Sequence, residues 1–273
     1  KPRQQALQPL EQRQISLLDY SNELNSMKIG IIGGTAMTNL ATDSINFIRI
    51  DDVIAETNFG DVPMKCFVTE KCTLFFIERH HGDGTTPPHN INHKANIESL
   101  KQAGVEQILS VCSVGTIPED FPPGSVGYAS QYIDLTGQAC TFFDDDAVFT
   151  SMTKPFDQIT NKILDSVLSE QQPGLKLGRT YWLAQGPQFE TPAEIDAIEK
   201  LGGEVVGMTM PRECKLSAEL NLPYSALVVA SNWAAGRDPS DSKKDLNHQD
   251  VASKAGENLG PVIACIEAII SRA

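Results

Sequence analysis

Strand-like apolar runs alternate with helical patterns along most of this 273-residue chain, and few folds accommodate that alternation. The strand candidates cover residues 28–35, 73–78, 107–114, 126–135, 180–185, 204–208 and 226–231. Helical patterns cover residues 92–103, 156–169, 193–201, 211–220 and about 246–271, the last of which could kink or split at Gly260-Pro261. The alternation predicts an α/β fold in which a mixed, largely parallel sheet is flanked by helices on both faces.

The chain is expected to form a single domain over residues 27–273, preceded by an N-terminal arm at residues 1–26. The arm is rich in Gln, Leu and Glu, and Leu17, Leu18 and Leu24 could form a short helix in it. The body contains no internal repeat, low-complexity tract or linker that would divide it. A chain of this length can bury one large core.

Composition argues against several classes of partner. The formal net charge is −13, whereas nucleic acids and anionic membranes are bound by basic surfaces. No apolar run reaches the roughly 18 to 20 residues of a membrane span, and the first residues lead into no apolar segment typical of a signal peptide. The six cysteines form no CxxC pair, which favours free thiols in a reducing cytoplasm over a disulfide framework.

The segment Gly186-Pro187-Gln188-Phe189-Glu190-Thr191 carries the most specific chemical signal. It lies where a strand candidate gives way to a helical pattern, and ligands of such sheets usually sit beyond the carboxyl ends of the strands. The ring of Phe189 can stack on a flat ring, and the carboxylate of Glu190 can accept a hydrogen bond from a ring N–H. The segment therefore predicts a site for a planar heterocycle.

Two other strand ends could hold an anion. Gly33-Gly34-Thr35 offers bare backbone N–H groups and a hydroxyl, although a simple tight turn could have the same sequence. It is not a G-x-G-x-x-G fingerprint and no Lys follows, so it gives little support to a dinucleotide site or a P-loop. Arg79 follows the apolar run 74–77 and could grip an anion through a bidentate fork. The alternative for Arg79 is an ion pair with a structural carboxylate.

Met208-Thr209 and Asn232 also follow strand candidates. Met208 could pack against the face of a sugar, or it could simply fill the core. The amide of Asn232 could recognise a carbonyl or a ring nitrogen, or it could cap the turn that follows.

Four of the five histidines, at positions 80, 81, 89 and 93, lie close together in the sequence. No metal-binding spacing connects them with a Cys or an acidic residue, so loop structure and anion contacts explain them more simply than a metal site. The chain also lacks the Ser-His-Asp order and the G-x-S-x-G elbow of nucleophilic hydrolases.

Taken together, these segments resemble the trimeric branch of the purine nucleoside phosphorylase and methylthioadenosine phosphorylase family. The likeness spans residues 28–272, and the ordered set of pieces is far more specific than any one of them. The matching pieces are residues 31–35, 79–80, 87–89 with 92 and 95–96, 113–115, 186–191, 206–209, and 232 with 234–236.

The resemblance implies a nucleoside phosphorylase-like fold and a reversible phosphorolysis, in which inorganic phosphate displaces a purine from C1′ of a ribonucleoside. It also implies a homotrimer or a dimer of trimers, and no metal or organic cofactor. By the same likeness, phosphate would be held by Thr35, Arg79, His80, Ser113 and Thr209. The nucleoside would be held by Phe189, Glu190, Met208, Asn232 and His248, and the catalytic residues would be Asn232, Glu190 and Arg79.

Two of these positions imply a preference for the base. Family members that act on 6-oxopurines resemble this chain in having Glu after the Phe and Asn at the position of Asn232, whereas those that act on adenine have a small hydroxyl residue and Asp. The carboxylate of Glu190 can accept a hydrogen bond from N1–H of hypoxanthine or guanine, but it would face the bare N1 lone pair of adenine. The expected substrates are therefore inosine and guanosine, as in purine salvage.

The 5′ substituent is less determined. The segment around His248 resembles the one in which inosine and guanosine phosphorylases place a His on the 5′-hydroxyl, although His248 could equally be an ordinary residue in the first turn of the last helix. Residues 208–210 and 221–224 look like the methylthioinosine branch. Phosphorolysis of 5′-methylthioinosine or 5′-methylthioadenosine is therefore the alternative function.

Three positions depart from the family pattern. Ala36 stands where Gly is common, Cys112 where Asn or Thr is common, and Arg212 where other members have Pro. Because Ala36 and Cys112 fall in the expected phosphate region, a catalytically weak purine-binding paralogue is a further alternative. A nucleosidase that uses water is disfavoured by Arg79 and Thr209.

Overall fold

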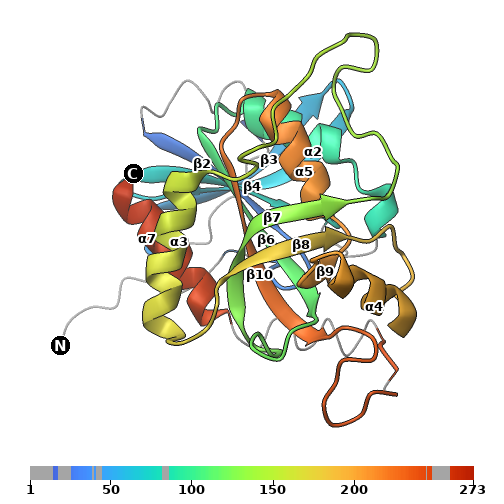
Figure 1. Cartoon of the computed structure of the whole chain (residues 1–273). Coiled ribbons are helices and arrows are strands. Elements are labelled where there is room, and N and C mark those ends of the chain that lie inside the picture. The colour runs from blue at the N-terminus through green and yellow to red at the C-terminus, as the bar shows by residue number, and fades with distance from the viewer. Residues whose placement is uncertain are drawn as a thin grey trace, which may run out of the picture.

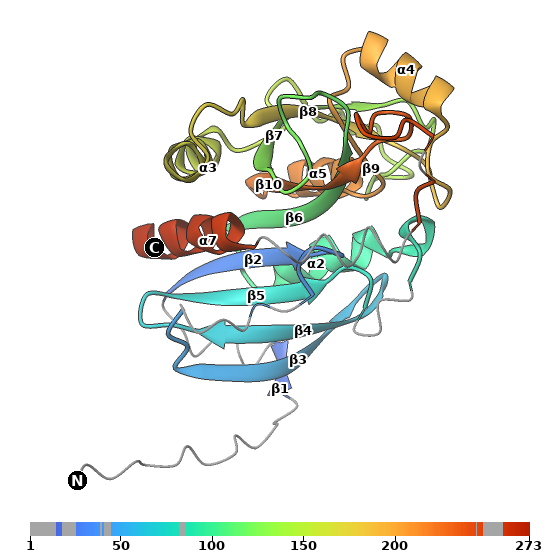
Figure 2. The same ribbon diagram turned by 90° about the horizontal axis from the view of Figure 1, so that it is seen from below.

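The computed structural model describes residues 15–17, 26–38, 40, 45–81, 86–243, 245–247 and 259–273. Within these residues, ten strands form one sheet in the order β1-β3-β4-β5-β2-β6-β10-β7-β8-β9 (Figure 1 and Figure 2). The strands are β1 Ile15–Ser16, β2 Met27–Gly33, β3 Arg49–Thr57, β4 Gly60–Val68, β5 Cys72–Glu78, β6 Gln107–Thr116, β7 Val126–Asp134, β8 Gly178–Leu183, β9 Val205–Gly207 and β10 Tyr224–Trp233. The helices are the 3-10 helix η1 Pro88–Asn90 and the α-helices α2 His93–Gln102, α3 Gln158–Gln171, α4 Pro192–Lys200, α5 Met210–Glu219 and α7 Gly260–Arg272.

The sheet brings several strand ends to one place. Strands β5, β2, β6 and β10 are parallel neighbours, so their carboxyl ends lie at the same edge. Strand β7 joins β10 in antiparallel orientation, and β8 and β9 continue from β7 in parallel. Strand β9 also pairs with the end of β6, at Gly115↔Val206. This half of the sheet therefore closes on itself beside the carboxyl ends of β6 and β10.

Helices cover both faces of the sheet, as predicted. Helices α2 and α5 lie on one side and α3 and α7 on the other (Figure 2). The core accordingly falls into two large clusters, one containing Ile97 of α2 and Leu216 of α5, the other Leu164 of α3 and Ile266 of α7. A sheet covered on both faces explains why its strands appear in the sequence as nearly continuous apolar runs.

Side-chain caps fix where three helices begin. The side chain of Asn92 accepts a hydrogen bond from the N–H of Ala95 at the start of α2, and Asp157 accepts from Thr160 at the start of α3. Thr191 and Glu194 form a reciprocal capping box at the start of α4. Such caps satisfy backbone N–H groups that have no partner within the helix. The box fixes the start of α4 directly after Phe189 and Glu190.

The predicted α/β class is confirmed, and each predicted strand and each of the first four predicted helices is present to within a few residues. The last helix begins at Gly260, and residues 248–258 of the predicted stretch lie outside the described residues. The hairpin of β3 and β4 was not predicted. Strand β4 contains Pro63, a residue that usually argues against a strand interior. Asn58 and Gly60 in the turn are the signal that could have revealed it.

The described part of the N-terminal arm contributes to the sheet. Ile15 and Ser16 pair in parallel with Val53 and Ile54 of β3, and Leu17 is buried in the core. Leu18 and Leu24, which were expected to share a helix with Leu17, lie outside the described residues. In the part of the chain that the structure describes, no helix is both long enough and apolar enough to cross a bilayer.

Candidate active site

A cavity of about 900 Å³ opens beyond the carboxyl ends of β2, β5, β6 and β10 and beside the end of β9. Nine residues expected in the site line it, although they come from distant parts of the sequence: Thr35, Arg79, His80, Ser113, Phe189, Glu190, Met208, Thr209 and Asn232. His248, the tenth, lies outside the described residues. Every expected site residue that the structure describes therefore lines one cavity, beyond the strand ends where ligands of such sheets usually bind.

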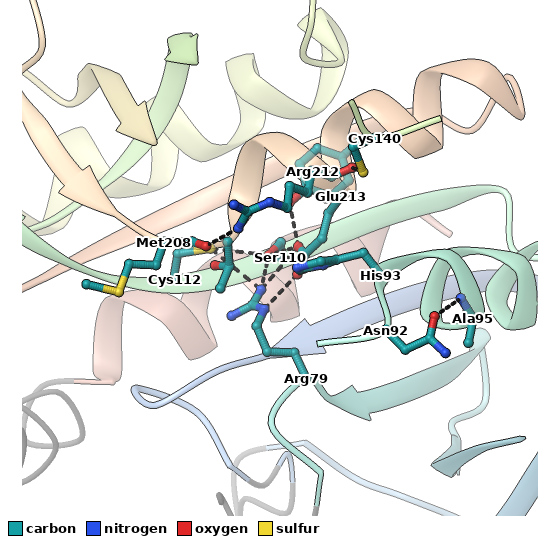
Figure 3. Close-up of polar contacts among 12 residues, drawn as sticks. Arg79, Asn92, His93, Ala95, Ser110, Cys112, Cys140, Met208, Arg212 and Glu213 are labelled. Atoms are coloured by element: carbon teal, nitrogen blue, oxygen red, sulfur yellow. Dashed lines mark hydrogen bonds and ion pairs between the residues drawn. The ribbon is translucent and has the colours of Figure 1, made fainter. Parts of the chain in front are cut away.

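Arg79 is held differently from the open anion clamp that the sequence suggested. The residue is only 1% exposed, and its fork is occupied by the carboxylate of Glu213, with Nε donating to Oε1 at 2.6 Å and Nη2 to Oε2 at 3.1 Å. Nη2 also donates to Ser110 Oγ, and Nη1 donates to the carbonyl of Val111. The alternative raised from the sequence, an ion pair with a structural carboxylate, is the arrangement that the structure contains (Figure 3).

Arg79 and Glu213 each stabilise the charged form of the other. Burial alone would lower the pKa of Arg79 and raise the pKa of Glu213. The attraction between the two groups outweighs burial, so the pKa of Arg79 is raised and the pKa of Glu213 is lowered. Both groups are therefore charged at neutral pH, and the pair is neutral as a unit.

The glycine turn packs directly on Arg79. A Cβ on Gly34 would overlap Nη1 of Arg79 and would lie 3.2 Å from the carbonyl oxygen of Val111. A Cβ on Gly33 would overlap the carbonyl oxygen of Met37. The two glycines are therefore required by close approach, and Gly34 brings the backbone beside Nη1 of Arg79.

Two residues with hydroxyl groups, Ser113 and Thr209, also line the cavity. Ser113 Oγ is buried and has no hydrogen-bond partner among the described residues. Thr209 is the N-cap residue of α5, but its side chain makes no capping hydrogen bond and lies instead next to Cys112 and Tyr181. His80 has one ring nitrogen, Nδ1, 2.8 Å from the carbonyl oxygen of Thr86. A guanidinium, hydroxyls and a helix N-terminus at one wall can bind an oxyanion.

The cavity is also lined by Phe189 and Glu190, the aromatic and acidic residues of the 186–191 segment. Gly186 has a φ of +65°, and a Cβ there would lie 2.5 Å from Met208 Sδ. Only glycine accommodates both the left-handed backbone and the close sulfur atom. The turn therefore sets Phe189 and Glu190 beside Met208 at the cavity.

Glu190 presents an unsatisfied acceptor. Its Oε1 atom is buried and has no hydrogen-bond partner among the described residues. Burial raises the pKa of this carboxyl group, and the nearby Glu194 adds to the effect. A buried carboxylate oxygen without a donor is costly to maintain, so the geometry favours a ligand that brings an N–H to this point.

Asn232 lies at the end of β10, and its amide makes two local hydrogen bonds. Its Nδ2 donates to the carbonyl of Trp233 at 2.8 Å, and its Oδ1 accepts from Ser231 Oγ at 2.8 Å. The local contact is the turn-capping role considered from the sequence, yet the side chain also lines the cavity. Since an amide has two donor hydrogens and an acceptor with two lone pairs, Asn232 can make both sets of contacts.

The three residues that depart from the family pattern lie near the part of the cavity that Arg79 lines. Ala36 lines the cavity, and Cys112 Sγ lies 3.6 Å from Arg79 Nη2. Arg212 is buried, and its Nη1 donates to the carbonyl of Met208 at 2.7 Å. Burial raises the pKa of the Cys112 thiol although Arg79 works against this, so the thiol is neutral.

The place of Glu213 beside Arg79 was not predicted from the sequence. Glu213 also accepts hydrogen bonds from Ser110 and from Tyr224, and His93 Nδ1 lies 3.9 Å from its Oε1. The available signal was a charged residue among buried positions of a helix, which identifies no partner. In the described part of the chain, no three His, Cys, Asp or Glu residues are placed to hold a metal ion.

Comparison with known proteins identifies relatives of this chain. Residues 28–271 match the family model described as Phosphorylase superfamily. The chain is 34% identical over 244 residues to a probable S-methyl-5′-thioinosine phosphorylase of Methanothermobacter thermautotrophicus, covering 89% of this chain and 83% of that protein. It is 30% identical over 253 residues to the 6-oxopurine nucleoside phosphorylase of Pyrococcus furiosus, covering 89% and 92%.

A solved structure extends the likeness to the fold. Methylthioadenosine phosphorylase from Schistosoma mansoni, in complex with adenine, superposes with a TM-score of 0.79 at 20% identity, covering 90% of this chain and 92% of that one. At that identity the likeness concerns the fold alone. The family match over nearly the whole body, together with relatives above 30% identity, shows that this chain belongs to the phosphorylase superfamily.

Proposed function

We propose that the protein catalyses the phosphorolysis of 6-oxopurine ribonucleosides, inosine and guanosine, to the free purine and ribose 1-phosphate. This is a pentosyltransferase reaction of purine salvage. The observation that carries the proposal is the carboxyl group of Glu190: its Oε1 is buried and has no partner among the described residues, and Glu190 lines the same cavity as Phe189 and Asn232.

The base side of the cavity suits a 6-oxopurine. Phe189 offers a ring face, Glu190 an acceptor for N1–H, and Asn232 an amide that can donate to the 6-carbonyl or to a ring nitrogen. Adenine presents a lone pair at N1 and an amino group at position 6, so it would leave Glu190 unsatisfied. Leaving such a group unsatisfied gives strong discrimination between otherwise similar substrates.

The anion side suits inorganic phosphate. Thr35, Ser113 and Thr209, each of which carries a hydroxyl group, line the cavity together with Arg79. A phosphate oxygen attacks C1′ while the C1′–N9 bond breaks, and the electron pair of that bond goes to the purine. Positive charge on the sugar is then stabilised by the adjacent phosphate, and Asn232 and Glu190 stabilise the departing base.

The glycine turn gives a direct test of this wall. We expect Gly34→Ala to raise the KM for phosphate by roughly 10- to 100-fold, the scale of an overpacked site. The added methyl group would displace a guanidinium that Glu213 holds from the other side. Steady-state kinetics with phosphate varied checks this, and Gly260→Ala, which meets open space, is the control. An unchanged KM in Gly34→Ala would remove Arg79 from the phosphate site.

A 5′-methylthio nucleoside is the second candidate substrate. Leu246 and Leu259 line the cavity and offer apolar contacts that a methylthio group would use. Several relatives at similar identity are named as probable S-methyl-5′-thioinosine phosphorylases. 5′-Methylthioadenosine is the variant suggested by the structural neighbours, and it requires an adenine base that Glu190 disfavours. A catalytically weak paralogue is the further alternative, since Glu213 occupies the fork of Arg79.

The remaining expectations belong to the same proposal. We propose that the enzyme works as a homotrimer or a dimer of trimers, with no metal or organic cofactor and with inorganic phosphate as co-substrate. All six cysteines are free thiols, which supports a reducing compartment such as the cytoplasm.

The experiment that tests the substrate is a side-by-side assay. The purified protein is supplied with phosphate and with inosine, guanosine, methylthioinosine, adenosine or methylthioadenosine, and release of the base is measured. The proposal predicts the highest kcat/KM for inosine or guanosine and poor use of both adenine nucleosides. A preference for an adenine nucleoside would contradict the assignment of Glu190, and a preference for methylthioinosine would select the second candidate.

A further inference from the structure

Glu213 is the most deeply buried acidic group near the cavity, and its contacts are unusually complete. It is 0% exposed. Its Oε2 atom accepts from Arg79 Nη2 at 3.1 Å, from Ser110 Oγ at 2.9 Å and from the Tyr224 hydroxyl at 2.8 Å, while Oε1 accepts from Arg79 Nε at 2.6 Å. A carboxylate with several donors is stable in its charged form, so Glu213 is negatively charged, and Figure 3 shows it beside Arg79 and Ser110.

The carboxylate of Glu213 contacts the guanidinium of Arg79, which is the cation of the proposed phosphate site. The Nε and Nη2 atoms of Arg79, which form the bidentate edge of the guanidinium, point to Glu213. Nη1 is the atom that the glycine turn meets at Gly34, and both Gly34 and Arg79 line the cavity. Gly34, which lines the cavity, therefore packs on a different guanidinium nitrogen from the two that Glu213 holds.

His93 does not supply a second positive charge. Both of its ring nitrogens are buried and have no hydrogen-bond partner among the described residues. Burial lowers its pKa to about 4, and Arg79 and Arg212 act in the same direction against the pull of Glu213. The imidazole is neutral at pH 7, so it does not offset Glu213.

Resting on the phosphorolysis proposed above, we infer that Glu213 is an internal counter-ion that positions Arg79 and weakens its attraction for phosphate. Removing one partner of a buried ion pair leaves an uncompensated charge, and a bound phosphate would then be the group that compensates Arg79. A tighter hold on phosphate in the ground state lowers KM without raising kcat. Glu213 thus sets the phosphate affinity of the site without contacting phosphate.

The test measures inorganic phosphate binding to the full-length chain by calorimetry. Glu213→Gln keeps the shape and removes the charge, so its Kd for phosphate is expected to fall about tenfold, or about 1.4 kcal/mol. In kinetics, the KM for phosphate falls while kcat does not rise. Glu213→Asp keeps the charge and does not bind phosphate more tightly than the wild type. Glu170→Gln, the same change at an exposed residue of α3, leaves the Kd unchanged.

A second variant is expected to change the Kd for phosphate in the opposite direction, and it tests the inference if Glu213→Gln does not fold. Tyr224→Phe removes one donor from Oε2, which leaves more of the carboxylate charge for Arg79. Its Kd for phosphate is expected to rise about threefold, the scale of one hydrogen bond. A wild type that binds phosphate, with Glu213→Gln binding equally or more weakly, overturns this inference alone. If Glu213→Gln does not fold, an unchanged or lower Kd for phosphate in Tyr224→Phe overturns this inference instead. A wild type with neither phosphate binding nor phosphorolysis overturns the proposed function as well.

Discussion

Replacing Glu190 by Ala is expected to lower kcat/KM for inosine by about 2 to 4 kcal/mol in activation free energy, or roughly 30- to 1,000-fold. The physical reason is the loss of the one buried carboxylate oxygen that the described residues leave without a donor at the base side of the cavity. The variant loses a charge-assisted hydrogen bond to N1–H, which strengthens as negative charge develops on the departing purine. Initial rates of hypoxanthine release, with inosine varied at saturating phosphate, give this value.

The neighbouring side chain supplies a matched control. Gln188 is exposed and is absent from the residues that line the cavity, so Gln188→Ala is expected to retain wild-type kinetics. Phosphate binding is expected to be the same in Glu190→Ala as in the wild type, because the carboxylate lies on the base side. Near-normal inosine turnover by Glu190→Ala would remove this residue from the base site and with it the main argument for a 6-oxopurine.

The second large effect concerns the identity of the base. Asn232→Asp is expected to lower the ratio of kcat/KM for inosine over adenosine by roughly 100-fold, the scale of about 2 to 3 kcal/mol for one buried polar group that is wrongly matched. A carboxylate accepts a hydrogen bond from a 6-amino group but repels the oxygen of a 6-carbonyl. Competition between the two nucleosides in one reaction, followed by chromatography of the bases, measures the ratio directly.

The control for this variant carries the same change in charge elsewhere. Asn90 in η1 is exposed and lies outside the cavity lining, so Asn90→Asp is expected to leave the ratio unaltered. Adding Glu190→Ser to Asn232→Asp is expected to shift the preference further toward adenosine, because the carboxylate that opposes N1 of adenine is then absent. An unchanged ratio in Asn232→Asp would show that Asn232 does not recognise the base.

The strand-end residues could be predicted because a parallel sheet gathers its carboxyl ends at one edge. Thr35, Arg79 and Asn232 are far apart in the sequence, but each follows an apolar run, and parallel pairing of β2, β5, β6 and β10 brings those runs together. The placement of Phe189 and Glu190 before a helix could also be predicted from the local sequence, because the capping box of Thr191 and Glu194 begins α4 directly after them.

The partner of Arg79 could not be predicted from the same reasoning. The sequence left open whether Arg79 meets an anion or a structural carboxylate, and 134 positions separate it from Glu213. Only the packing of α5 against the sheet brings the carboxylate to the guanidinium. The β3–β4 hairpin was missed for a different reason, because Pro63 occupies a strand position that normally needs a backbone N–H.

The central claim is that phosphate, and not water, takes the ribosyl group from the purine. The most direct measurement is the release of hypoxanthine from inosine by the purified chain, with phosphate titrated from zero and the sugar product identified. We predict no release without phosphate, saturation as phosphate is added, and one ribose 1-phosphate formed for each hypoxanthine. Undiminished release in the absence of phosphate, with free ribose as the product, would contradict the account.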